Sequence, residues 1–238
     1  MRSIQTLFTT AFLTVLFLSN SNAIAKEKVL PESEGLWEYT DLITSDGKSL
    51  PLTGIFLIKN GVFLQQSIFI GSPFSEQGSM AHAGTCWAGG AGLRLTANQT
   101  LSMSPVDEQK LVSMGETQHD LAVTRDKNSL TLVFGAGTST VQTFNRIGNA
   151  DDMRVFNFSN GALAFADGYF ILVTGDSESA TTGYGKYKQK ENTLTLDIIR
   201  WSQSDGGSTI NQKDITLQAA FDGKVLQLPN GQSFSVIP

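Results

Sequence analysis

This chain of 238 residues has one cysteine and two histidines, and it contains no run of basic residues. A single cysteine excludes an internal disulfide and the cysteine-rich kind of structural zinc site. The formal net charge of −5 argues against a nucleic-acid partner. No G-x-S-x-G, P-loop or G-x-G-x-x-G motif occurs where a strand would lead into a helix, so we expect no cofactor and none of the common hydrolase, kinase or dehydrogenase activities.

The N-terminal segment has the pattern of a secretory signal peptide. Arg2 precedes an apolar run over residues 7–18, and the small residues at 23–25 (AIA) provide the expected cleavage site. The run is too short and too rich in threonine for a transmembrane helix, which needs about 20 apolar residues. We therefore predict a signal peptide over residues 1–25, an exported protein in the periplasm or outside the cell, and no membrane span.

The rest of the chain predicts β-structure. Short runs rich in Val, Ile, Phe, Thr and Leu alternate with Gly, Asn and Asp, which is typical of strands joined by tight turns. In GIFLIKNGVFLQQSIFI, the Asn60-Gly61 pair predicts a two-residue hairpin turn. No window sustains the spacing of an amphipathic helix. We therefore predict an all-β, antiparallel fold.

The sequence also matches itself. GIFLIKNGVF (54–63) aligns with GALAFADGYF (161–170), and further pairs such as QTLSMS with NTLTLD follow in the same order. This order predicts two related β units, residues 30–148 and residues 149–238. The first contains enough strands for a closed barrel of about eight strands. The second forms a barrel if MRVFNFS (153–159) supplies its first strand, and otherwise a half-barrel packed on the first unit.

The ends of the first unit carry a family resemblance. It begins with Gly35-Leu36-Trp37 and ends with Phe144-Asn145-Arg146. This resembles the lipocalin-like (calycin) family, here in a duplicated form, in which the tryptophan of a G-x-W motif stacks on an arginine at the closed barrel end. The resemblance covers about half of the chain. It implies that Gly35, Trp37 and Arg146 close the barrel, and that its open end admits a small apolar ligand.

The stretch MAHAGTCWAGGAGL contains two candidate site residues, His82 and Cys86. Its glycines argue against a helix, and on a strand the two side chains lie on one face about 13 Å apart. They cannot form a nucleophile and base pair through this segment. We expect Cys86 to be a small buried side chain and His82 to be hydrogen-bonded on an interior wall, so that both line a cavity at different depths.

Other candidates lie on the first predicted strand and near the second histidine. Tyr39 and Asp41 alternate with Trp37, so we expect both to share its inward face. A buried Asp41 would have a raised pKa and act as an acid or base, whereas at the barrel mouth it would be solvated. Glu116, His119 and Asp120 are close in sequence, but two histidines in the chain leave little for a second metal ligand, and we predict no metal site.

Three functions from different classes follow. The first is an exported lipocalin-like protein that binds a small apolar or amphipathic molecule, with Tyr39, Asp41, His82 and Cys86 as ligand-binding candidates. The second is an isomerase, cyclase or lyase that resembles allene oxide cyclase-type barrels, with His82 and Asp41 as catalytic candidates. The third is an envelope interaction module without a ligand.

Overall fold

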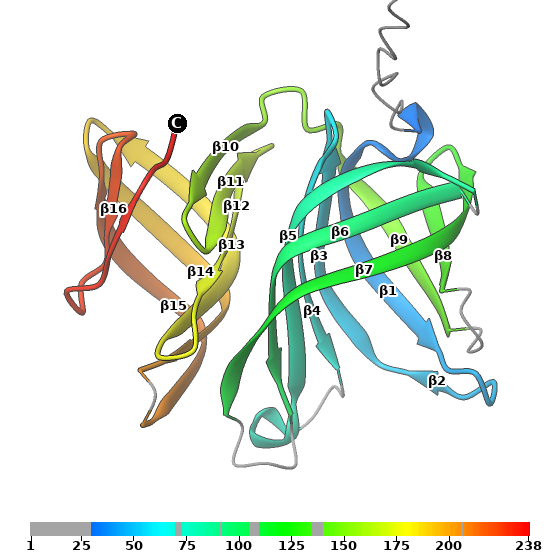
Figure 1. Ribbon diagram of the computed structural model, residues 1–238, viewed down its shortest axis with the longest axis horizontal. Helices are drawn as coiled ribbons and strands as arrows, with labels where there is room; N and C mark the ends of the chain where they lie inside the picture. Colours follow the sequence, from blue (N-terminus) through cyan, green and yellow to red (C-terminus); the bar gives the residue numbers. More distant parts are fainter. Residues whose placement is uncertain (1–29, 70–72, 91, 105–109, 135–139, 206) are drawn as a thin grey trace, which may run out of the picture.

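The computed structural model describes residues 30–69, 73–90, 92–104, 110–134, 140–205 and 207–238. The predicted signal peptide lies outside these residues. In this part of the chain the helices are two three-residue 3-10 turns, η1 (Pro31–Ser33) and η2 (Phe74–Glu76). No helix there has the length and apolar character needed to cross a membrane. Antiparallel strands make up 74% of the structure, which confirms the predicted fold class (Figure 1).

The first sheet closes on itself as a barrel (Figure 1). Its strands are β1 (Gly35–Ile43), β2 (Ser49–Leu50), β3 (Leu52–Lys59), β4 (Val62–Phe69), β5 (Gly78–Gly89), β6 (Gly92–Met103), β7 (Leu111–Asp126), β8 (Ser129–Phe134) and β9 (Thr140–Gly148). Pairing of β1 with β9 completes the ring. The short β2 extends β3 and is separated from it by Pro51, which has no N–H to donate. The closed barrel therefore has eight strands, as predicted.

The second sheet is a nearly closed barrel. Its strands, in spatial order, are β10 (Arg154–Phe158), β11 (Gly161–Ala166), β12 (Tyr169–Gly175), β13 (Ala180–Lys190), β14 (Thr193–Ser204), β15 (Thr209–Phe221), β16 (Val225–Gln227) and β17 (Ser233–Ser235). β10 pairs with β11, so MRVFNFS does supply the first strand. The ends of the sheet meet where Ile237 N–H donates to the Asn157 carbonyl at 2.8 Å and where Phe158 packs against Phe234.

Equivalent backbone features recur in the two sheets. Gly54 on β3 and Gly161 on β11 have φ of +128° and +144°, and a Cβ on either would collide with a carbonyl oxygen of the paired strand. The turns that follow each place a non-glycine residue at positive φ, Asn60 at 52° and Asp167 at 49°. Both pairs have the predicted spacing, since 161 − 54 and 167 − 60 both equal 107. The sequence repeat therefore corresponds to a repeated hairpin.

We expect Gly54→Ala and Gly161→Ala each to lower the free energy of unfolding by about 1–3 kcal/mol, because the added Cβ must push the paired strand away. Gly47→Ala is the matched control, since Gly47 also has positive φ (+80°) but has nothing within 4 Å of the added Cβ. Denaturant unfolding measures all three. If Gly47→Ala is as costly as the other two, close strand approach is not the reason for glycine at the repeated positions.

Apolar side chains form three separate cores. One fills the first barrel and includes Phe56, and a second fills the second barrel and includes Phe165. The third lies between the barrels, where outward-facing side chains of β3 to β6, such as Leu57, meet those of β11 to β13, such as Ile171. The two barrels therefore pack side by side through an apolar contact (Figure 1).

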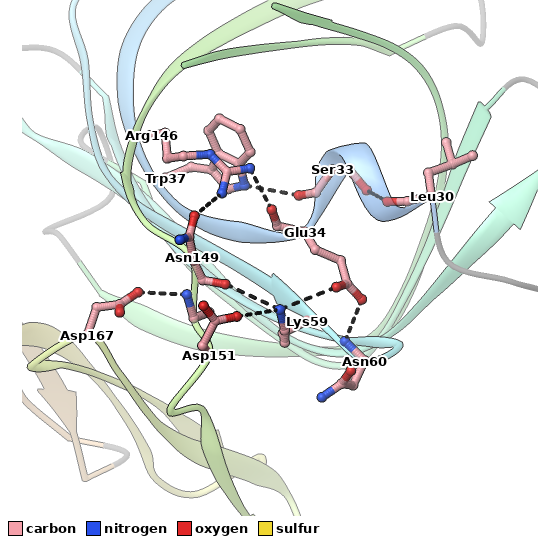
Figure 2. Close-up of polar contacts among 11 residues, drawn as sticks. Leu30, Ser33, Glu34, Trp37, Lys59, Asn60, Arg146, Asn149, Asp151 and Asp167 are labelled. Carbon is pink, nitrogen blue, oxygen red and sulfur yellow. Dashed lines mark hydrogen bonds and ion pairs between the residues drawn. The ribbon is translucent and has the colours of Figure 1, made fainter. Parts of the chain in front are cut away.

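Side chains of both barrels contact the linker between them (Figure 2). Lys59 of the first barrel forms ion pairs with Asp151 at 3.1 Å and with Glu34 at 3.5 Å. Asp167, in the β11–β12 turn of the second barrel, accepts a hydrogen bond from Ala150 N–H at 2.7 Å. These contacts join the start of β1, the linker and the second sheet at one end of the molecule.

Candidate functional site

The same end of the first barrel contains the predicted closing stack (Figure 2). The guanidinium carbon of Arg146 lies 4.5 Å from the ring centroid of Trp37, which is fully buried. Arg146 Nη2 donates to the Glu34 carbonyl at 2.9 Å, and the indole N–H of Trp37 donates to the Ser33 carbonyl at 3.0 Å. Gly35 has φ of +145°, and a Cβ there would lie 3.2 Å from Arg146 Cζ. Side chains therefore fill this end of the barrel.

A cavity of about 80 Å³ lies inside the first barrel. Its lining includes the apolar side chains of Phe63, Leu95 and Phe134 and the polar side chains of Gln65, His82 and His119. Phe134 and His119 are only half-buried, so they mark the side nearer the surface. A cavity of about 150 Å³ can hold benzene. The space in this barrel is therefore smaller than one that encloses a whole benzene ring, so a ligand of that size would place one end there and extend past the half-buried side.

Three buried side chains form a hydrogen-bonded chain at this cavity. Tyr39 O–H donates to Gln65 Oε1 at 2.9 Å, and Gln65 Nε2 lies 2.7 Å from His82 Nδ1. An amide nitrogen can only donate, so Nδ1 accepts and the neutral imidazole carries its proton on Nε2. His82 Nε2 is buried and has no hydrogen-bond partner among the described residues. His82, which lines the cavity, therefore has a buried N–H without a partner in the described part of the chain.

Burial keeps this donor uncharged. It lowers the pKa of His82 to about 3, and the neighbouring His119 contributes in the same direction. The two imidazole rings meet edge to face with centroids 5.9 Å apart, and burial also lowers the pKa of His119. In the described part of the chain, no group of three His, Cys, Asp or Glu side chains gathers to hold a metal ion. At neutral pH the cavity therefore offers a neutral donor and aromatic surface.

Cys86 lies on the same face of β5 as His82 but packs into the barrel core and does not line the cavity. Its backbone N–H donates to the Gly61 carbonyl at 2.9 Å, in the turn between β3 and β4. Burial, with a smaller contribution from the Glu34 charge, raises the pKa of the thiol to about 12. Cys86 is therefore a protonated core residue, at a different depth from His82.

The expectation that Asp41 shares the inward face of Tyr39 was wrong. The register between β1 and β9 shifts between these two residues, so Thr40 is the extra residue of a β-bulge. The bulge reverses the alternation of side chains, and Leu42 packs into the barrel core in place of Asp41. Asp41 instead accepts a hydrogen bond from Ser49 Oγ at 2.7 Å on the exposed side.

Two residues of the site were not predicted as such, Gln65 and His119. Gln65 aligns with Leu172 in the sequence repeat, since 65 + 107 = 172. A polar residue in one unit at a position that is apolar in the other is the signal that could have identified Gln65. His119 was considered only as a metal ligand. It lies directly opposite Leu95 in the β6–β7 pairing, which places it on the inward face beside His82.

Comparisons with protein-family models, with curated proteins and with solved structures found no match. The first barrel contains a small cavity lined by aromatic side chains and by His82, whose buried, neutral N–H has no partner in the described part of the chain.

Proposed function

We propose that the chain is an exported lipocalin-like protein that binds a small apolar or amphipathic molecule in its first barrel. The observation that carries this proposal is the buried Nε2–H of His82, a residue of the cavity lining, which has no partner among the described residues. Leaving a buried donor unsatisfied costs about 1–3 kcal/mol. A ligand with an acceptor oxygen at this place would recover that cost, and the tryptophan–arginine stack supports the lipocalin-like assignment.

The residues that line the cavity restrict which functional groups a ligand can have. Both histidines are neutral at neutral pH, and the described lining contains no lysine or arginine, so a carboxylate would lose its hydration without gaining a counter-charge. A ketone, ester or ether oxygen suits a neutral N–H donor. The apolar remainder of the ligand would contact Phe63 and Phe134 and extend toward the half-buried side of the cavity.

The alternative barrel enzyme had His82 and Asp41 as its catalytic candidates. Asp41 bonds Ser49 on the exposed side of β1, whereas His82 lines the interior, so the two do not form an acid and base pair. Exposed apolar surface between the units would favour the interaction module, but the apolar side chains there are buried as the core between the barrels. Ligand binding is the function that the arrangement of Tyr39, Gln65 and His82 supports best.

Cyclopentanone and cyclohexanone, compared with cyclopentane and cyclohexane, test the proposal. Each ketone is paired with the hydrocarbon of the same ring size, and only the ketone has a hydrogen-bond acceptor. We expect both ketones to bind the purified protein about tenfold more tightly than the hydrocarbons, because a net hydrogen bond is worth about 1 kcal/mol or more at a buried donor. Thermal unfolding at equal free ligand concentration measures the difference as a larger rise in Tm.

Substitution at the donor gives the control. His82→Phe keeps a planar ring but has no N–H, so the advantage of the ketones should vanish while the hydrocarbons still bind. Asn145→Ala changes an exposed amide on the outside of β9 and should leave the advantage intact. Equal binding of ketone and hydrocarbon to the unsubstituted protein, or a ketone advantage that persists in His82→Phe, would contradict the proposal.

A further inference from the structure

A second and larger cavity, of about 390 Å³, lies in the cleft between the barrels. One wall comes from β4, β5 and β6 of the first barrel, and the other from the β10–β11 hairpin and the C-terminal Ile237. It shares no lining residue with the cavity that contains His82. Its volume is within the range of about 300–1,000 Å³ that is usual for small-molecule sites. We propose that this cleft is a binding site for a neutral saccharide, of one or two sugar units.

Four primary amides from the two barrels line this cleft. Gln99 bonds Ser113 and Gly175, and the other three are asparagines. Asn98 is the extra residue of a β-bulge in β6, Asn157 is on β10, and Asn160 is in the turn that follows it. All three side chains are exposed and make no hydrogen bond within the described part of the chain. The hydroxyls of Thr85 and Ser159 add two further polar groups. The cleft therefore gathers side chains that can both donate and accept hydrogen bonds, as sugar hydroxyls do.

The remaining lining is apolar and uncharged. Val62, Leu64 and Ala162 form part of it, and the half-exposed Ile237 contributes a further hydrophobic surface. The described lining contains no Asp, Glu, Lys, Arg or His. A charged ligand would lose its hydration without gaining a counter-charge, and a purely apolar one would cover the amides without bonding them. A neutral polyhydroxylated molecule, which has both hydroxyls and apolar C–H surface, satisfies both parts of the lining.

Hydrogen bonds hold the two walls in place before any ligand binds. Gln99 of the first barrel donates through Nε2 to the Gly175 carbonyl of the second barrel at 3.0 Å, and Gly175 N–H donates to the Asn160 carbonyl at 3.0 Å. Ile237 N–H donates to the Asn157 carbonyl at 2.8 Å. A preformed site avoids the entropy cost of ordering its walls, which favours binding of a small ligand.

Titration calorimetry of the full chain with glucose, N-acetylglucosamine, cellobiose and chitobiose tests the proposal. We expect saturable binding of at least one of these neutral sugars. Glucosamine and glucuronate, which carry a positive and a negative charge, are the matched probes for the lack of charge in the cleft, and both should bind at least about tenfold more weakly, because neither finds a counter-charge there. Failure of all four neutral sugars to bind, or equal binding of the charged ones, would overturn the proposal.

Single substitutions locate the site. Asn98→Ala and Asn160→Ala should each weaken binding of the best neutral sugar about tenfold, as expected for the loss of one hydrogen bond. Asn145→Ala, which alters an exposed amide that does not line the cleft, should have no effect. His82→Phe should also leave sugar binding unchanged. The sugar site in the cleft and the ligand site in the first barrel can therefore be tested independently. Full affinity in both Asn98→Ala and Asn160→Ala would place the sugar elsewhere and contradict the proposal.

Discussion

Replacing Trp37 with alanine is expected to lower the free energy of unfolding by about 3–5 kcal/mol. Trp37 is fully buried and is one of the largest side chains in the core of the first barrel. The change removes its packing, its hydrogen bond to the Ser33 carbonyl and its stack with Arg146, the last worth about 1–2 kcal/mol when shielded from water. Denaturant unfolding monitored by circular dichroism measures the loss.

Trp87→Ala is the matched control for this experiment. Trp87 is a half-buried tryptophan on β5 that does not belong to the barrel core, so its removal should cost far less. Trp37→Phe should give an intermediate loss, because a phenyl ring keeps part of the packing over Arg146 but has no indole N–H. Equal destabilisation by Trp37→Ala and Trp87→Ala would show that the stack does not organise the barrel.

Acidification is expected to destabilise the protein through His82. The folded state holds this imidazole neutral, with its pKa lowered from 6.5 to about 3, whereas the unfolded chain binds a proton below about 6.5. The unfolded state therefore gains protons first as the pH falls, and folding stability contributed by His82 is complete above about pH 6.5 and is lost as the pH decreases toward 3. The expected loss is about 1.4 kcal/mol per pH unit within that window.

Comparison with His82→Phe isolates this effect from the carboxylates that also titrate in acid. The difference in unfolding free energy between the unsubstituted protein and His82→Phe should be constant above the window and should shrink as the pH falls within it. His119 is half-buried and its pKa is also lowered, so His119→Gln should reduce the acid sensitivity by a smaller amount. A difference that does not change with pH would mean that His82 is accessible to protons in the folded barrel.

The fold followed from patterns that extend over many residues. Alternation predicted the strands, the spacing of 107 residues predicted the repeated hairpin, and the G-x-W and arginine pair predicted the contact between Trp37 and Arg146 that closes the first barrel. Each of these signals depends on several positions at once. A single substitution or insertion does not obscure them, which is why strand order and barrel closure could be inferred before the structure.

The residues of the site were harder to predict from the sequence, because a single extra residue in a strand changes which side chains point into the barrel. The bulge at Thr40 turns Asp41 out of the barrel, and a bulge in a strand has no clear sequence signal here. The partners of His82 are also distant in sequence. Gln65 lies on the preceding strand, and His119 comes two strands later, so only the pairing register brings them together. Tyr39 was correctly placed in the interior because it precedes the bulge.

In the proposed function, His82 presents a neutral Nε2–H to a ligand acceptor inside the first barrel. Proton–nitrogen correlation spectra of the imidazole side chains measure this directly, with and without cyclohexanone. We predict that the neutral ring of His82 carries its proton on Nε2, and that this resonance shifts saturably as the ketone is added but not with cyclohexane. A proton on Nδ1, or an Nε2–H resonance that the ketone leaves unchanged, would contradict ligand binding at His82.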